Sequence, residues 1–447
     1  MNFDDDMEVL LDSFDPEERR SGLKALAHVE RRRLPTAGMN VNMHFHSFFS
    51  FNAEEWSPTH IAWEARKAGL YAAGLCDFDV LDGLEEFIEA GLVLGLRATV
   101  NLETRAYLKE YAGVDISSPG EPGVIYVMGA GFAEGVEPDS PQGRGLEGFR
   151  ERARARNEGL VGRINPHLAG IDIDYEEDVL PLTPSGSATE RHIIRAYINK
   201  SKAVFEHASA VASFWAKRLD RTVEEVVELL ADPPSMEEAV RTGLVKRGGV
   251  GYEQPSPTTF PPVEEFIRWV ASCGAIPMIT WLDGTSPGEK DGRAMLECMA
   301  AKGGAALNII PDRVWNVTDP SAQAARIANL NAIVAAANRM HLPINIGTEM
   351  NRQGLPFVDD LDGEALRPHK ETFLRGARIM VGHTVLLRYA GMAYVGARAS
   401  AEFGDAQAKN VFFESVGGLP PLTEEQAGKL EDMGVERALT WLRNAVK

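Results

Sequence analysis

The sequence predicts an α/β protein in which β-strands and α-helices alternate to build a parallel sheet or barrel. Strand-like and helix-like segments follow one another from Met39 to about Gly131, and the same rhythm resumes at Pro262. Between these stretches, residues 131–260 lose the rhythm. Alternating strands and helices are typical of βα units with parallel strands, so we expect one such layer that carries an insertion.

The first stretch begins with an expected strand that ends at His44 and His46. A helix follows it, with Ser57 as the N-cap, Pro58 in the first turn and Gly69 just after the end. The other elements expected here are a helix at 81–90 and strands at 71–76, 97–103 and 124–128.

The insertion is expected to be mostly helical. Residues 131–147 are rich in glycine, proline and acidic residues and predict a loop, whereas Thr189 predicts a cap for a helix that reaches about Phe205. Further helices are expected at 223–230, 263–272, 293–301, 322–340 and 422–446, and strands at 275–281, 305–310 and 344–348. The chain then divides into a helical lead-in (1–35), a barrel (36–130 and 261–400), the insertion (131–260) and a helical tail (401–447).

The composition is that of an ordinary globular chain and argues against several classes of function. The chain has 447 residues, 44% of them hydrophobic and 25% charged, with no apolar run of membrane-spanning length. A net charge of −19 argues against general binding to nucleic-acid backbones. An acidic N-terminus unlike a secretion signal and three widely spaced cysteines predict reduced thiols and a cytoplasmic location. Nothing in the sequence indicates an oligomeric state.

The most informative motif is His44-Phe45-His46, at the end of the first strand. Strand alternation places Asn42, His44 and His46 on one face and Val41 and Phe45 on the other. Two imidazoles on one face at a strand end are well placed to bind a metal ion together. A His-x-His motif alone is more often a pair of satisfied structural histidines, so the motif needs support from other residues.

That support comes from acidic residues at the ends of other expected strands. Asp77 and Asp79 end the second strand, Glu103 ends the third, and Glu349 ends the last. In a barrel, the carboxyl ends of the strands meet at one face, where metal-dependent hydrolases collect their ligands. The sequence therefore predicts a divalent metal site on His44, His46 and Glu103, with Glu349 as a further ligand or a base.

The pattern resembles the PHP (polymerase and histidinol phosphatase) superfamily, particularly its single-domain phosphoesterases with a helical insertion. The resemblance covers about residues 39–352 and rests on the His-x-His strand, Glu103, His192 at the start of an insertion helix, and the segments 76–83, 261–278 and 347–351. It implies an irregular (β/α)7-type TIM-like barrel and a metal-dependent hydrolase.

The chain departs from the family pattern at most of the family's metal ligands. The departures fall at Phe51 or Asn52, at Phe78, near Tyr126, near Thr280 or Trp281, and at Glu349 and Asn351. A full trinuclear site is therefore not expected. One divalent ion, zinc, manganese or iron, remains feasible, because hydrolytic zinc sites need only about three protein ligands and a water.

Other polar residues offer candidates for acid–base work and for holding an anionic substrate. Asp79 is a candidate base, although a polar turn in which Asp79 caps the next helix is the favoured alternative. Arg191 and His192, near a helix start, and Arg352 are candidates for binding an anionic group, although the first two can equally form a solvated helix face.

Two functions from different classes remain open. The first is a divergent metal-dependent hydrolase that acts on a phosphoester or a related small anionic substrate. The second is a barrel that has lost catalysis and binds a small molecule or a partner, which the replaced ligands favour. Phe78, Tyr126 and Trp281 can line a pocket for a ring-bearing ligand or simply fill an abandoned cavity.

Overall fold

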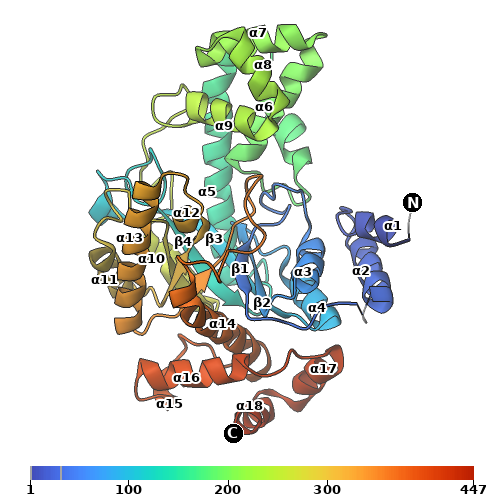
Figure 1. Cartoon of the computed structure of the whole chain (residues 1–447), viewed down its shortest axis with the longest axis vertical. Coiled ribbons are helices and arrows are strands. Elements are labelled where there is room, and N and C mark those ends of the chain that lie inside the picture. The colour runs from blue at the N-terminus through green and yellow to red at the C-terminus, as the bar shows by residue number, and fades with distance from the viewer. Residues whose placement is uncertain (1–2, 31–32) are drawn as a thin grey trace.

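The computed structural model describes residues 3–30 and 33–447 and confirms the predicted α/β class. One seven-stranded sheet, with its strands in chain order, curls into a nearly closed barrel (Figure 1). Its ends are joined by the turn after the last strand: the Glu349 amide donates to the His44 carbonyl (2.8 Å), and the His46 amide donates to the Glu349 carbonyl (2.9 Å). The strands are β1 (Val41–Phe45), β2 (Ala72–Phe78), β3 (Arg97–Tyr107), β4 (Val124–Phe132), β5 (Ile276–Trp281), β6 (Ala306–Ile309) and β7 (Ile344–Ile346).

One strand runs against the expected direction. β4 is antiparallel to both β3 and β5, whereas all other neighbouring strands are parallel. The segment 108–123 between β3 and β4 holds only the short 3-10 helix η1 (Lys109–Tyr111). A parallel return needs a longer crossover, so the chain reverses and pairs as a hairpin.

Helices surround the barrel as the alternation predicts, and they share its hydrophobic core. The Ser57 hydroxyl accepts a hydrogen bond from the His60 amide (3.0 Å), which confirms the predicted N-cap. None of the helices in the described ranges is long and apolar enough to cross a membrane. The helices are α3 (Pro58–Lys67), α4 (Leu84–Leu94), α10 (Val263–Ser272), α11 (Gly292–Ala301), α12 (Asp312–Trp315), α13 (Pro320–Arg339), η6 (Arg367–His369) and α14 (Lys370–Ala390).

The segment between β4 and β5 rises above the barrel as a mostly helical layer (Figure 1). It has a hydrophobic cluster of its own, built around buried residues such as Ile193, Tyr197 and Trp215. The boundaries 131 and 260 stay a prediction, since the first helix of this layer also packs on α10. The elements are α5 (Pro141–Ile164), η2 (Asn165–Leu168), η3 (Tyr175–Val179), η4 (Leu180–Leu182), α6 (Glu190–Val204), α7 (Ala208–Leu219), α8 (Val223–Ala231), α9 (Pro233–Val240) and η5 (Arg241–Val245).

The predicted loop over 131–147 is wrong in its second half, because α5 already begins at Pro141. The Ser140 hydroxyl caps this helix by accepting a hydrogen bond from the Gly143 amide (2.9 Å). Two of the glycines that suggested a loop, Gly143 and Gly145, instead allow close packing. A Cβ atom on Gly145 would collide with Cδ1 of Trp269.

This contact predicts different outcomes for two alanine substitutions on one helix. Gly145→Ala must displace Trp269 and should lower the free energy of unfolding by about 1–3 kcal/mol. Gly148→Ala, where a Cβ atom meets nothing within 4 Å, should raise it by roughly 0.5–1 kcal/mol through better helix propensity. Urea unfolding of both variants checks the prediction, and equal effects would contradict it.

Both ends of the chain cover the outside of the barrel. The lead-in helices α1 (Phe3–Leu10) and α2 (Pro16–Glu30) contact α3 and α4 and contribute buried Leu23 and Leu26 to the main core. The C-terminal segment forms α15 (Ala397–Glu402), α16 (Ala406–Gly417), α17 (Glu424–Met433) and α18 (Val435–Ala445). The single helix predicted at 422–446 is therefore two helices, divided at Gly434, whose φ of 74° ends α17.

Candidate metal centre and adjoining pocket

Four side chains gather at the carboxyl ends of the barrel strands. His44, His46, Glu103 and Glu349 each offer one ligand atom, and these atoms lie within 4.8 Å of one another. Nε2 of His44 and Nε2 of His46 both stand 3.6 Å from Oε2 of Glu103. The structure thus brings together four residues that the sequence placed at the ends of three different strands.

The local backbone explains how each residue reaches the cluster. His44 belongs to β1 and His46 follows it, on the inner face that alternation predicts, and Glu103 points inward from β3. Glu349 sits in a left-handed turn, with φ values of 64° at Glu349 and 57° at Met350. Non-glycine residues adopt this conformation only when the surroundings hold them there. Here the two backbone hydrogen bonds to β1 hold the turn in place.

Several polar atoms of the cluster are buried and have no hydrogen-bond partner among the described residues. His44, His46 and Glu103 are almost fully buried. Within the described residues, both Nε2 atoms and both carboxylate oxygens of Glu103 lack a hydrogen-bond partner. Buried polar atoms are nearly always satisfied, so a group of orphaned atoms facing one another calls for an explanation.

A divalent cation fits this arrangement. Ligand atoms around one tetrahedral ion stand roughly 3.3 Å apart, close to the 3.6 Å seen here. Two imidazole nitrogens and one or two carboxylate oxygens form a common donor set for catalytic zinc and for other divalent transition metals. The residues present therefore suit one such ion, held by His44, His46 and Glu103 with Glu349 beside them.

The pKa values of the cluster residues also suit a bound cation. Burial, together with the charges of His44 and Arg191, holds the pKa of His46 well below its usual range, so His46 is neutral. Burial likewise raises the pKa of Glu103, although His44 opposes this shift. For His44, burial is outweighed by Cys76 and Glu103, and its pKa lies well above the usual value. Burial therefore disfavours charge on both His46 and Glu103 in the protein alone.

The two histidines differ in the group that lies beside Nδ1, the ring nitrogen that does not face Glu103. Nδ1 of His46 lies 3.3 Å from the Ser50 hydroxyl, which donates to Asp77 (2.6 Å). Nδ1 of His44 lies 3.3 Å from the amide nitrogen of Asn308. An amide donor at this position leaves the proton of neutral His44 on Nε2. Coordination through that atom requires the Asn308 amide to turn over and present its oxygen.

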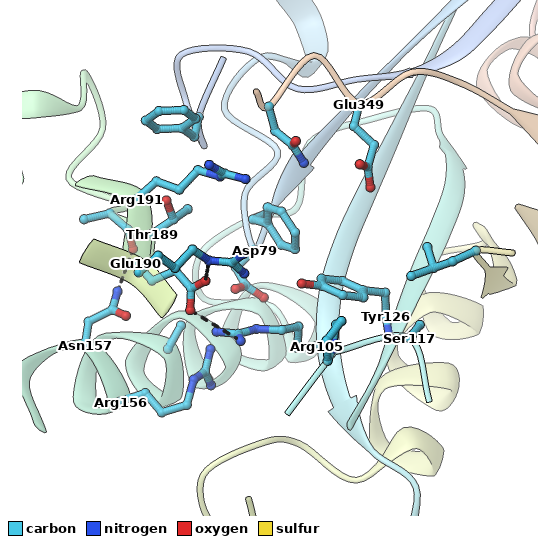
Figure 2. Close-up of a pocket in the computed structure, with 18 of the residues that line it drawn as sticks. Asp79, Arg105, Ser117, Tyr126, Arg156, Asn157, Thr189, Glu190, Arg191 and Glu349 are labelled. Atoms are coloured by element: carbon cyan, nitrogen blue, oxygen red, sulfur yellow. Dashed lines mark hydrogen bonds and ion pairs between the residues drawn. The ribbon is translucent and has the colours of Figure 1, made fainter. Parts of the chain in front are cut away.

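A pocket of about 190 Å³ adjoins the cluster between the barrel and the helical insertion. Figure 2 shows side chains from both layers directed into it, among them Glu349, Arg191, Asp79 and Tyr126. Glu349 belongs to the cluster and also lines the pocket, so it links the two. The charged and aromatic lining residues are Phe51, Phe78, Asp79, Arg105, Tyr126, Arg156, Glu190, Arg191, Arg241, Arg313 and Glu349.

Positive charge dominates the far part of this pocket. Glu190 is the central counter-charge: it pairs with Arg241 (2.6 Å), Lys246 (3.2 Å) and Arg105 (3.7 Å). Arg105 also pairs with Glu121 (2.7 Å). Burial opposes the charge of Glu190, but the neighbouring cations outweigh it and hold the Glu190 pKa well below its ordinary value.

Two other arginines of the pocket have no carboxylate within ion-pair distance in the described part of the chain. Arg156 donates to the Thr259 carbonyl (2.8 Å) and lies over Phe260, and burial lowers its pKa to about 10. Arg191 lies 5.6 Å from the centre of the Phe51 ring and contributes to the low pKa of His46. Guanidinium groups left free in a half-buried pocket are suited to an anionic ligand.

Aromatic residues lie between the cluster and the pocket. The Phe78 ring stacks on His46, with centroids 4.9 Å apart and an angle of 5° between the planes. Tyr126 lies 6.0 Å from Phe78 and lines the same pocket. Trp281 is buried in the barrel core and does not line the pocket. Phe78 therefore covers one side of the cluster, and the Glu349 side faces the pocket.

The remaining predicted site residues fall in three places. Asp79 lines the pocket and accepts a hydrogen bond from Thr104 (2.6 Å). The N-cap of α4 is Gly83, so the capping alternative for Asp79 is wrong.

His192 packs against the Phe51 ring, and its Nδ1 accepts a hydrogen bond from the Thr189 amide (3.0 Å). Burial lowers the pKa of His192 to about 3, so it is a neutral helix cap. Arg352 lines a smaller cleft beside the main pocket, together with Arg191.

Most of the arginines that line the pocket were not predicted as site residues from the sequence. Arg105 had a usable signal, because it lies two residues after Glu103 on β3 and so shares its face. Its register partner on β4 is Tyr126, which also lines the pocket. Arg156 and Arg241 come from the insertion and had no local signal, since only the packing of that layer on the barrel brings them to the pocket.

Comparison with known proteins finds solved structures that are similar to this one. No family model and no curated protein matches the sequence. An amidohydrolase from Chromobacterium violaceum, solved with sulfate and without metal, has a TM-score of 0.49 and 17% identity and covers 75% of this chain and 96% of its own. A protein of Bifidobacterium adolescentis, named as a candidate metal-dependent phosphoesterase, has a TM-score of 0.45 and 19% identity, with the same coverage.

Proposed function

We propose that this protein is a metal-dependent hydrolase that cleaves a phosphoester or a related ester of a small anionic compound. The observation that carries the proposal is the cluster of buried, unpartnered ligand atoms on His44, His46 and Glu103, next to Glu349. A cluster of this kind without a cation would leave several polar groups unsatisfied in the protein interior. The arginine-lined pocket beside it supports an anionic substrate.

In this proposal one divalent ion, when bound, acts as a Lewis acid and lowers the pKa of a water molecule. His46, and His44 once Asn308 has turned, would hold it through Nε2, and Glu103 would hold it through a carboxylate oxygen. Glu349 faces both the cluster and the pocket, so its carboxylate serves as the base that takes a proton from the attacking water. The P–O ester bond breaks as the new P–O bond forms, and the leaving oxygen takes a proton.

Asp79 is suited to return that proton. It lines the pocket, and burial raises its pKa against the opposing hydrogen bond from Thr104 and the charge of Arg156. A raised pKa favours the protonated carboxyl group that a general acid requires. Arg191 and Arg313, which stand at the metal end of the pocket, neutralise charge on the reacting group.

One observation favours the second function, a ligand-binding module without catalysis. Phe78 stacks on His46 and occupies space that a substrate needs on that side of the cluster. A module of this kind would still bind an anion through Arg156 and Arg191, but it would release no product. Binding and turnover must therefore be measured separately.

The test combines metal analysis with hydrolysis. Purified protein should contain about one zinc, manganese or iron ion per chain by elemental analysis and should hydrolyse p-nitrophenyl phosphate or its diester. His44→Ala and His46→Ala should each reduce both signals to near zero. His60→Ala is a matched control, because His60 pairs with Asp12 on the outside of the barrel and should leave both signals unchanged. A metal-free wild type, even after loading with these metals, would overturn the proposal, whereas a metal-bound but inactive one would favour the binding module.

A further inference from the structure

The turn after β1 contains a chain of hydrogen bonds that ends on a proposed metal ligand. Nδ1 of His46 lies 3.3 Å from the Ser50 hydroxyl oxygen, and this hydroxyl lies 2.6 Å from Oδ1 of Asp77. All three side chains are almost fully buried. The chain joins the end of β2, where Asp77 lies, to the end of β1.

The direction of the protons along this chain follows from its chemistry. An ionised carboxylate only accepts hydrogen bonds, so the single hydroxyl proton of Ser50 must point at Asp77. The Ser50 oxygen can then only accept from His46, and Nδ1 must carry the imidazole proton. The other nitrogen, Nε2, keeps its lone pair, and Nε2 is the atom that faces Glu103.

We propose that Ser50 and Asp77 are positioning residues that fix His46 as the Nδ1–H tautomer and so set the metal affinity of the site. This inference rests on the proposed metal site. Metal-bound histidines commonly donate their second N–H to an outer partner, and loss of that partner typically weakens metal binding 10- to 100-fold. Here the outer partner is a serine hydroxyl, and the buried carboxylate behind it fixes the hydroxyl's direction.

Asp77 also has a purely structural contact, which provides a control. The Ser47 amide donates to Oδ1 of Asp77, and the Ser47 hydroxyl donates to Oδ2, both at 2.7 Å. Ser47 thereby anchors the turn but does not contact either imidazole through a hydrogen bond in the described chain. Ser47→Ala and Ser50→Ala each remove one hydroxyl from the same carboxylate, and only the second changes the contact with His46.

The experiment measures tautomer and affinity independently. In metal-free protein labelled with ¹⁵N-histidine, NMR should show His46 with its proton on Nδ1, identified by the signal that disappears in His46→Gln. Ser50→Ala should shift this signal toward the Nε2–H form and weaken Zn²⁺ or Mn²⁺ binding 10- to 100-fold in calorimetric titrations. Ser47→Ala should keep the tautomer and change the affinity by less than about threefold, even if it lowers the melting temperature.

The outcomes separate this inference from the proposed function. A wild-type His46 that carries its proton on Nε2 overturns the inference, and so does a Ser50→Ala protein that binds metal as tightly as wild type. Equal losses of affinity in Ser47→Ala and Ser50→Ala also overturn it, since they indicate a structural effect on the turn. A wild type that binds no metal removes the proposed function instead, while the NMR measurement still decides the tautomer.

Discussion

Glu103→Gln should abolish tight metal binding and, at the same time, make the metal-free protein more stable. In the absence of metal, Glu103 is a buried carboxylate whose two oxygens have no hydrogen-bond donor among the described residues. Replacing a buried, unsatisfied charge by a neutral group of the same shape should raise the free energy of unfolding by about 1–3 kcal/mol. The same change removes the charged ligand, so metal affinity should fall at least 100-fold.

Thermal unfolding with and without metal should therefore rank the two proteins in opposite orders. Without metal, Glu103→Gln should melt at a higher temperature than wild type. With excess Zn²⁺ or Mn²⁺ the order should reverse, because a ligand stabilises only the chain that binds it. Glu349→Gln is the matched control: Glu349 is partly exposed and lies 3.7 Å from Arg313, so its loss should not stabilise the metal-free protein.

The effect of pH follows from the raised pKa of Glu103. Burial makes the folded protein hold the Glu103 proton more tightly than the unfolded chain does. Stability from this group is therefore full at low pH and declines as pH rises through the folded pKa. The advantage of Glu103→Gln in metal-free protein should grow over the same range. An advantage that is constant or shrinks with rising pH would show that Glu103 has another partner.

The sequence was sufficient to predict the cluster of candidate metal ligands, because each of these residues sits at a strand end with a regular period. Strand alternation put His44 and His46 on one face, and the βα rhythm placed Glu103 and Glu349 at the carboxyl ends of other strands. A barrel brings those ends together whatever the exact length of each element, so moderate errors in element boundaries did no harm. The reversed direction of β4 did not disturb the site, because Glu103 lies on β3.

The pocket beside the cluster was less predictable, because it forms between two layers. His192 was selected for its position at a helix start, but it uses Nδ1 to cap that helix. Its neighbour Arg191 does line the pocket. Arg241 lies in an irregular turn of the insertion, and only the way this layer packs on the barrel brings it to Glu190. Contacts of this kind leave no periodic signal in the sequence, so no local pattern could have revealed them.

Glu190→Gln should be among the most destabilising substitutions in this protein. The Glu190 carboxylate is largely buried and contacts Arg241, Lys246 and Arg105. Removing it leaves these three cations close together with only Glu121 and Glu238 as remaining counter-charges. Breaking a buried ionic network by deleting one partner typically lowers the free energy of unfolding by about 3–5 kcal/mol. Glu238→Gln is the control, since Glu238 is half-exposed and lies 3.6 Å from Arg241, and its loss should change stability by less than about 0.5 kcal/mol.

The pH dependence of this effect has the opposite sign to that of Glu103. The cations hold the Glu190 pKa well below its ordinary value of 4.5. Its stabilising contribution is therefore complete at neutral pH and is lost as pH falls below 4.5 through the lowered pKa. Wild type and Glu190→Gln should differ most at pH 6–8 and converge in acid. If the stability difference between wild type and Glu190→Gln persists in acid, the effect comes from packing and not from charge.

An added anion should repair the defect if the pocket is an anion site. In Glu190→Gln, phosphate can take the place of the lost carboxylate among Arg241, Arg105 and Arg156, so the melting temperature of the variant should rise more with millimolar phosphate than that of wild type. Potassium chloride at matched ionic strength controls for general screening of the cations. Recovery with phosphate but not with chloride would show that these arginines bind an anion specifically. Equal recovery in both salts would show that the arginines form only a structural ion-pair network. The pocket would then no longer be evidence for an anionic substrate.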